Sequence, residues 1–222
     1  MGTELVFTRP AEITGIMSGI VTLPTDFDKE KESLPVIVFL HGAGERGKPE
    51  MPGMNRLKIH GIPKLFCADN DYHGLRVITL TPQCPENMTW INLTYPLKKW
   101  IEEAVAEFNG DTNRISVTGI SMGGFGTWDM ITSFPDYFSC AAPICGGGAA
   151  FRTRSLSGVK MRVYHGLDDE AVPFTCSLEM TMAARKNGAD ITLTAYDKVG
   201  HGSWVPAYEQ TDLVEWLAEQ TR

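Results

Sequence analysis

Short apolar segments alternate with longer amphipathic segments along most of this chain. Six of the short segments are predicted to be strands, and several are almost wholly apolar, as strands covered on both faces should be. These segments are Pro35–Leu40, Leu75–Thr81, Arg114–Gly119, Cys140–Cys145, Met161–Tyr164 and Ile191–Tyr196. Ile16–Leu23 alternates only in part, and we expect it to be a seventh strand at an edge of the sheet.

The amphipathic segments between the strands predict helices. From Leu97 to Phe108 apolar residues recur at the spacing of one helical face, and Pro96 stands at the start. Further helices are expected over 123–133, 175–187 and 206–220. Strands that alternate with helices imply crossover connections, so the fold class is α/β, with a mainly parallel sheet of about seven strands and helices on both faces. In such sheets functional sites form at the carboxyl ends of the strands.

The length of 222 residues fits one domain spanning residues 1–222. Twenty basic and 27 acidic residues give a formal charge of −7, which argues against nucleic acid or an anionic membrane as the main partner. No apolar run approaches the roughly 20 residues that a bilayer requires, and the N-terminus carries no apolar signal core. Five cysteines, without a CxxC spacing, favour a reduced, cytoplasmic protein with no structural metal.

A G-x-S-x-G motif, Gly119 to Gly123, follows the strand that begins at Arg114. The string alone is a weak signal, but a strand precedes it and a predicted helix follows it, which is the context that this motif requires. Glycines in so tight a turn remove side chains that would collide, and Ser121 is lifted above the sheet. The N-terminus of the following helix favours developing negative charge. We therefore predict that Ser121 is a nucleophile rather than a simple helix cap.

Two further strand ends carry the groups that a nucleophilic serine needs. Asp168 and Asp169 follow the strand that ends at Tyr164, and His201 lies in a glycine bracket after the strand that ends at Tyr196. A serine needs a base, and the base needs a carboxylate that fixes its tautomer. The chain order Ser121, then Asp168 or Asp169, then His201 is the Ser…Asp…His order of one architecture.

A glycine-rich bend, 41–47, follows the first buried strand. Such a bend can aim backbone N–H groups at a neighbouring site, as an oxyanion hole requires. His41 and His165 both precede a glycine at a strand end, and we interpret them as structural side chains rather than bases.

At these residues the chain resembles the α/β-hydrolase superfamily, and within it the small bacterial phospholipase/carboxylesterase-like and dienelactone-hydrolase-like esterases. The matching strings are LHGAGERG, TPQCPENMTW, GISMGGFGTWDM, FPDYFSCAAPICGG, HGLDDEAVP and VGHGSW. The resemblance implies that the catalytic acid is Asp169. It also implies an oxyanion hole made by the backbone N–H groups of Met122 and Ala43, with Gly44 as the alternative to Ala43.

The segment Gly146–Val159 is too short for the helical cap that many lipase-like relatives insert there. An open site without a cap domain is therefore expected, with 44–66 as the best candidate for the substrate-side wall. Trp90, Trp204 and Gly44 are candidate substrate-binding residues, although packing in the core is the alternative for both tryptophans. Met51, Met54, Ile59 and Ile62 are candidates for a shallow groove.

The resemblance implies a serine carboxylesterase that works through an acyl-enzyme, with no metal or organic cofactor. The shortness of the segment 146–159 leads us to expect that it prefers short-chain acyl esters. Its partner would be a small-molecule ester. One alternative is a peptidase or amidase of the prolyl-oligopeptidase kind; another is an acetyl or feruloyl esterase acting on plant polysaccharide. A non-catalytic binding protein of the same fold is a third. The sequence indicates neither the physiological ester nor the oligomeric state.

Overall fold

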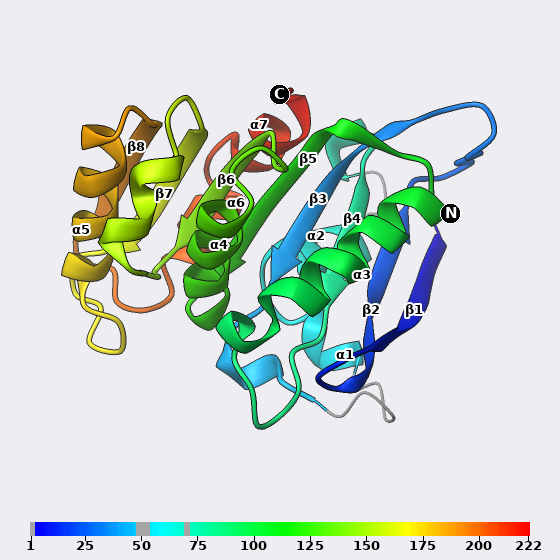
Figure 1. Cartoon of the computed structure of the whole chain (residues 1–222), viewed down its shortest axis with the longest axis horizontal. Helices are drawn as coiled ribbons and strands as arrows, with labels where there is room; N and C mark the ends of the chain where they lie inside the picture. The colour runs from blue at the N-terminus through cyan, green and yellow to red at the C-terminus, as the bar shows by residue number, and fades with distance from the viewer. Residues whose placement is uncertain (1–2, 48–53, 69–71) are drawn as a thin grey trace.

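The computed structural model describes residues 3–47, 54–68 and 72–222. In these residues an eight-stranded sheet has the order β1-β2-β4-β3-β5-β6-β7-β8 (Figure 1). The strands are β1 (Thr3–Ala11), β2 (Gly15–Leu23), β3 (Leu34–Leu40), β4 (Ile78–Pro82), β5 (Gly110–Ile120), β6 (Cys140–Ile144), β7 (Lys160–Gly166) and β8 (Asp190–Tyr196). β1, β2 and β4 pair antiparallel, and every pair from β4 to β8 is parallel. The mainly parallel α/β sheet predicted from the sequence is confirmed.

One strand was not predicted, and one lies elsewhere in the sheet than expected. β1 forms the edge, and Phe7 is its one buried hydrophobic residue, so the apolar signal of this segment is weak. β2 is not an edge strand, because it pairs with β1 on one side and β4 on the other. Its last seven residues are buried, which explains why its alternation was incomplete.

Helices cover both faces of the sheet. α3 (Thr94–Glu107), α4 (Met122–Ser133) and α5 (Phe174–Lys186) lie on one face, and α1 (Met54–Leu57), α2 (Gly61–Ala68), α6 (Trp204–Glu209) and α7 (Leu213–Glu219) lie on the other (Figure 1). Short 3-10 turns complete the fold: η1 (Ala43–Glu45), η2 (Tyr72–Gly74), η3 (Trp90–Leu93) and η4 (Ala150–Ser155).

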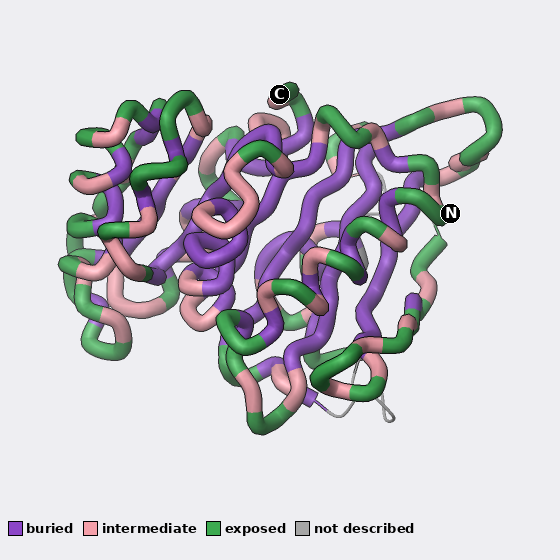
Figure 2. The backbone as a smooth tube through the Cα atoms, in the orientation of Figure 1, coloured by how far each residue is buried: buried purple, intermediate pink, exposed green. Residues whose placement is uncertain are grey.

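The hydrophobic core is divided by the sheet into two layers. In β3, Val36 and Val38 pack in the layer beneath α3 and α4, whereas Ile37 and Phe39 pack in the layer beneath α2, α6 and α7. β3, β4 and β6 are buried along their whole length, as Figure 2 shows. Because these strands face protein on both sides, their sequences are continuous apolar runs rather than alternating ones.

The C-terminal segment forms two helices, not the single helix predicted over 206–220. The break lies at 210–212. The hydroxyl of Thr211 donates to Ala207 O at 2.6 Å and accepts the N–H of Leu213 at 3.2 Å. This side chain therefore ends one helix and starts the next, which its local pattern of apolar residues did not indicate.

No helix in the described ranges is both long and apolar enough to cross a bilayer. The carboxyl ends of β3, β5, β6, β7 and β8 lie along the same edge of the sheet, because these strands are parallel neighbours. The segments that follow β3, β5, β7 and β8 carry Ala43, Ser121, Asp169 and His201.

Candidate active site

Ser121 lies between the end of β5 and the start of α4, in a strained backbone conformation. Its φ is 53° and its ψ is −118°, a region that side-chain-bearing residues seldom adopt. The N–H of Ser121 donates to Ile144 O at 3.0 Å and contacts Cys145 Sγ at 3.3 Å. Strand β6 thus holds the strained residue in place, with its side chain at the carboxyl edge of the sheet.

Two glycines make this turn possible because other backbone occupies the space of their missing side chains. A Cβ on Gly119 would lie 2.4 Å from the carbonyl oxygen of Gly123. A Cβ on Gly123 would lie 1.8 Å from the carbonyl oxygen of Leu40 at the end of β3. The glycines of the G-x-S-x-G motif are therefore required by close packing of α4 against two strands.

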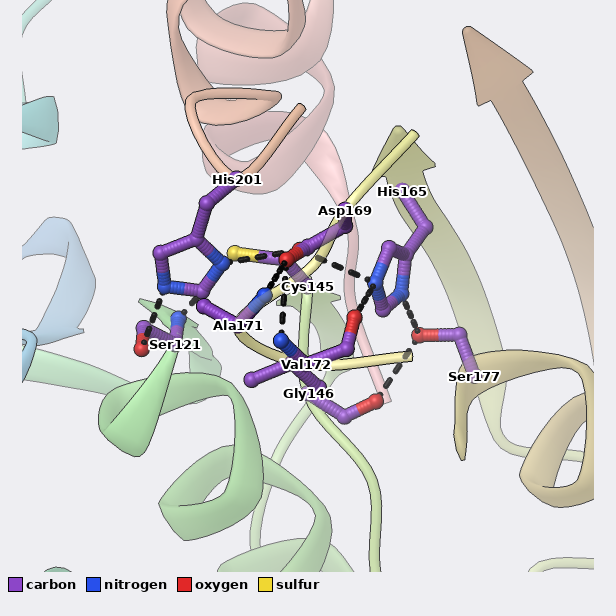
Figure 3. Close-up of polar contacts among 9 residues, drawn as sticks. All are labelled: Ser121, Cys145, Gly146, His165, Asp169, Ala171, Val172, Ser177 and His201. Atoms are coloured by element: carbon purple, nitrogen blue, oxygen red, sulfur yellow. Dashed lines mark hydrogen bonds and ion pairs between the residues drawn. The ribbon is translucent and has the colours of Figure 1, made fainter. Parts of the chain in front are cut away.

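His201 connects Ser121 to Asp169 (Figure 3). Its Nε2 lies 2.9 Å from Ser121 Oγ, and its Nδ1 lies 2.8 Å from Asp169 Oδ2. A carboxylate only accepts, so Nδ1 carries the proton, and Nε2 is left to accept the serine hydroxyl. The structure brings together three side chains that the sequence placed at three separate strand ends.

Asp169 is buried, and both of its carboxylate oxygens have partners. Oδ1 accepts the N–H groups of Ala171 and Val172, each at 2.9 Å. Burial acts to raise the pKa of this carboxyl, but the N–H of Val172, the hydrogen bond from His201 and the N–H of Ala171 outweigh it and lower the pKa. The group is therefore a carboxylate at neutral pH. Asp168 is exposed, so it is Asp169 that lies against His201.

The predicted oxyanion donors lie at the starts of an α-helix and of a short 3-10 turn. Met122 is the first residue of α4, and Ala43 is the first residue of η1, which closely follows the end of β3. The first N–H groups of a helix have no acceptor within their own helix, so each can donate to a ligand. Gly44, in the same turn as Ala43, is exposed and has open space around its α-carbon.

The two candidate tryptophans have different positions. Trp204 is half-buried, and its ring meets His201 edge-on, with the centroids 5.4 Å apart. Trp90 is 1% exposed, and its indole N–H donates to His41 O at 2.9 Å. The expectation that Trp90 forms a pocket wall is wrong, because this side chain is buried beneath the turn after β3 and offers no surface to a substrate.

The proposed wall 44–66 lies only partly within the described residues. Residues 48–53, which include Met51, fall outside them, as does the side chain of Met54. Ile62 is fully buried and belongs to the core, so it cannot line a groove, whereas Ile59 is exposed. The segment 146–159 contains η4 as its one helical element.

His41 is a structural side chain, as its place beside a glycine suggested. Its Nδ1 donates to Gly42 O at 2.6 Å, and its Nε2 accepts the N–H of Cys84 at 2.9 Å. Burial lowers the pKa of His41 to about 4, so the ring is neutral at neutral pH. The hydrogen bond from Cys84 holds the end of β3 against the segment that follows β4.

His165 was also predicted to be a structural side chain, but it contacts the site directly. It is fully buried, and its Nε2 lies 3.2 Å from Asp169 Oδ2. Sequence analysis missed this contact. The signal was the spacing of four residues between His165 and Asp169, which can bring the two side chains together when a tight turn follows the strand.

Within the described part of the chain, one group of three side chains could offer ligand atoms to a metal ion. These are Cys145, Asp169 and His201, whose atoms lie within 4.8 Å of one another. His201 and Asp169 are hydrogen-bonded to each other. Burial raises the pKa of the Cys145 thiol to about 12, so its sulfur is protonated at neutral pH, whereas a metal binds the thiolate. The group fits a hydrogen-bonded relay better than a metal centre.

Comparison with known proteins gives the family. The model of the dienelactone hydrolase family matches residues 93–215, more than half of the chain. Poly(3-hydroxyalkanoate) depolymerase C of Paucimonas lemoignei is 28% identical over 110 residues, which is 49% of this chain. The chain spans 20% of the length of that curated relative.

Solved structures give the same fold. A thermostable esterase has a TM-score of 0.84 and 33% identity, over 99% of this chain and 63% of its own. The feruloyl esterase module from Clostridium thermocellum, complexed with sinapinate, has a TM-score of 0.76 at 17% identity, over 96% of this chain and 87% of its own. An acylaminoacyl peptidase of Pyrococcus horikoshii has a TM-score of 0.73 at 18% identity, over 94% of this chain and 39% of its own. The last two likenesses show the α/β-hydrolase fold alone.

Proposed function

This chain belongs to the dienelactone hydrolase family, and we propose that it is a serine carboxylesterase that cleaves short-chain acyl esters of small molecules. One observation carries the proposal: a continuous hydrogen-bonded relay from Ser121 Oγ through His201 to the buried carboxylate of Asp169, with distances of 2.9 and 2.8 Å. This arrangement gives a serine hydroxyl both a base and a group that stabilises the base once it is charged.

In the first half of the proposed reaction, Ser121 Oγ attacks the ester carbonyl carbon while His201 Nε2 takes the hydroxyl proton. The carbonyl oxygen becomes an oxyanion, and the N–H groups of Met122 and Ala43 donate to it. The tetrahedral intermediate then collapses. His201 gives its proton to the departing alcohol, and the acyl group remains on Ser121 as an ester.

In the second half, a water molecule takes the place of the alcohol. His201 accepts a proton from this water as its oxygen attacks the acyl carbon, and the same N–H groups stabilise the second oxyanion. Collapse breaks the bond to Ser121 Oγ, which recovers its proton from His201, and the carboxylic acid is released. Asp169 keeps its negative charge throughout and stabilises the imidazolium of His201 in both halves.

The preference for short acyl groups rests on the segment 146–159. It contains the 3-10 turn η4 and offers no long amphipathic helix that could cover an acyl chain. Each CH₂ group buried on binding contributes about 0.8 kcal/mol, so a long-chain preference requires a deep apolar tunnel. We propose that the site is open, and that it is contained in one α/β-hydrolase domain over residues 1–222.

We also propose that the protein works in a reducing compartment, the cytoplasm. Cys84, Cys140, Cys145 and Cys176 are free thiols, and the first three are buried. Burial raises the pKa of Cys84, Cys140 and Cys145 to about 12 in each case, which favours inert core thiols over reactive ones.

The test compares esters with amides on the wild-type protein and on Ser121→Ala. The panel contains 4-nitrophenyl esters of two, four, eight and twelve carbons, a feruloyl ester and aminoacyl 4-nitroanilides. We expect the highest kcat/KM at two to four carbons, no rate increase when the substrate aggregates, and a loss of about 10⁶-fold in turnover in Ser121→Ala.

Labelling with a fluorophosphonate separates catalysis from simple binding. We expect one phosphonyl group on the peptide that contains Ser121, and none on Ser121→Ala. A protein that neither reacts with the probe nor cleaves any ester would be a non-catalytic binding protein of this fold. Faster cleavage of the anilides than of the esters would instead show a peptidase.

A further inference from the structure

Asp169 Oδ2 lies between two histidine rings rather than one. His201 Nδ1 approaches it at 2.8 Å and His165 Nε2 at 3.2 Å (Figure 3). The side chains of His165 and Asp169 are both 0% exposed, so no solvent screens their interaction. The steps of the proposed reaction use His201 alone and leave His165 without a role.

A chain of short contacts fixes the protons on His165. Its Nε2 lies 2.9 Å from Val172 O, and its Nδ1 lies 2.7 Å from Ser177 Oγ. Ser177 Oγ in turn lies 2.8 Å from Gly146 O. Figure 3 shows these contacts running from the loop after β7, through the ring, to α5 and the end of β6.

The number of protons needed follows from the chemistry of these groups. Backbone carbonyls and a carboxylate accept hydrogen bonds and donate none, so Nε2 must carry a proton toward Val172 and Asp169. Ser177 has one hydroxyl proton. If it points to Gly146 O, then the 2.7 Å contact needs a proton on His165 Nδ1 as well. Ser177 Oγ contacts both His165 Nδ1 and Gly146 O. With a neutral His165 ring, one of these two contacts would have no proton between its two acceptor atoms, which is costly in a buried site.

We propose that His165 is protonated on both ring nitrogens, and that this buried imidazolium is a positioning residue that holds the Asp169 carboxylate. Its charge also balances that of Asp169. Before reaction His201 must be neutral to accept the serine proton, so the buried carboxylate needs another cation beside it. The inference rests on the proposed function where it concerns His201, but the protonation of His165 is testable without any activity.

Other titratable groups near the pair do not supply this charge. The thiols of Cys145, on the β6 side, and Cys176, on α5, both have pKa values raised mainly by burial, so both are uncharged at neutral pH. The ring of Phe174 packs against His165, and that of Trp204 packs against His201. Among the described residues, the titratable groups that remain in contact are Asp169, His165 and His201, and before reaction His165 is the one that can carry the positive charge.

The first test reads the protons directly. The full-length protein is labelled with ¹⁵N-histidine, and its ring nitrogens are observed by NMR at pH 7.5, with His165→Gln used for assignment. We expect His165 to show two protonated, imidazolium-type nitrogens. His41 is an internal control, because its Nε2 accepts the N–H of Cys84 and must appear as a bare nitrogen. A bare nitrogen on His165 would overturn the proposal.

The second test uses the pH dependence of kcat/KM for the best ester. His165 and His201 contact the same carboxylate oxygen, so removing a positive charge from His165 lets His201 accept a proton at higher pH. The acid limb of the profile is the pH range in which kcat/KM falls as the pH is lowered. We expect this limb to lie about one pH unit higher in His165→Gln and in Ser177→Ala, and the latter variant lacks the partner of His165 Nδ1. His73→Gln changes an exposed histidine paired with Glu215, and should leave the limb in place.

A purely structural role for His165 predicts a different result. The variants would lose activity or thermal stability, but the acid limb would stay where it is in the wild type, and that outcome overturns the electrostatic role. If the wild type cleaves no ester, the proposed function fails, whereas the NMR spectrum still decides whether His165 is an imidazolium. If His165→Gln does not fold, Ser177→Ala and the wild-type spectrum carry the test.

Discussion

Gly123, at the start of α4, lies directly against the carbonyl group of Leu40 at the end of β3. A Cβ on Gly123 would lie 1.8 Å from that oxygen, a separation that atoms not bonded to each other do not reach. The contact joins the segment that carries Ser121 to the segment that carries Ala43. The spacing between the proposed nucleophile and one proposed oxyanion donor is thus set by two backbones in contact.

Gly123→Ala should therefore destabilise the protein and separate these two segments. The clash is with backbone, which cannot rotate away, so we expect a loss of about 3 kcal/mol in the free energy of unfolding. Urea unfolding followed by circular dichroism measures it. Gly202→Ala is the matched control, because a Cβ there meets nothing within 4 Å. Equal stabilities for the two variants would contradict the packing argument.

Replacing Ser121 should reveal the strain stored at this residue. Glycine adopts positive φ without steric cost, whereas alanine does not, and strain of this kind is worth on the order of 1–3 kcal/mol. We expect the free energy of unfolding of Ser121→Gly to be about 1 kcal/mol larger than that of Ser121→Ala, although both variants lack the hydroxyl. Thermal unfolding of the pair measures the difference, and a more stable alanine variant would show that the turn is relaxed.

The two neighbouring aspartates can be separated by conservative substitution. Asp169→Asn keeps an oxygen that can accept the N–H groups of Ala171 and Val172, so the loop after β7 should keep these hydrogen bonds. It loses the charge that sets the tautomer of His201, so kcat/KM should fall by about 10³–10⁴-fold. Asp168→Asn, on an exposed residue, should cost less than about tenfold. The reverse ranking would show that the carboxylate in contact with His201 is not the one that matters.

His41 should make the stability of the protein fall in mild acid. Burial lowers its pKa to about 4, below the value of 6.5 that it has in the unfolded chain. The unfolded state therefore binds a proton first as the pH falls. The contribution of His41 to the free energy of unfolding is therefore complete above pH 6.5 and is lost progressively between pH 6.5 and pH 4. It amounts to about 3 kcal/mol at most.

Urea unfolding at pH 7.5, 6 and 5 tests this window. Asp169, whose pKa is lowered, contributes only below the window, since its carboxyl begins to protonate in the unfolded state near pH 4. In His41→Gln the stability should start lower but fall less steeply from pH 7.5 to 5. An unchanged slope would show that another group is responsible.

The sequence predicted those parts of the fold whose cause is local. The segment from Arg114 through Ser121 into α4 was predicted correctly, because an apolar run, a glycine-rich turn and a helix follow one another without interruption. β1 was missed because its single buried hydrophobic residue, Phe7, produces no periodic signal. The break at Thr211 depends on one hydroxyl with two partners, which a pattern of apolar residues does not contain.

Tertiary packing decided the rest of the candidate site. An aromatic residue that follows a strand can face either a cleft or the core, and only the packing of η3 under the turn after β3 shows that Trp90 is in the core. The contact of His165 with Asp169 depends on how the chain turns after β7, and its link to Ser177 depends on where α5 lies. Sequence spacing permits these contacts but does not require them.

The place of β8 in the sheet determines which part of the protein gives way first. Within the described residues β8 is an edge strand that pairs with β7 alone. It is largely exposed, and the loop that follows it carries His201. Ser121, by contrast, is anchored between the fully paired strands β5 and β6. Edge elements open at lower free energy than central ones, so fluctuations that detach β8 move His201 away while Ser121 keeps its position. We therefore expect mild heat or denaturant to separate His201 from Ser121 before the central strands unfold.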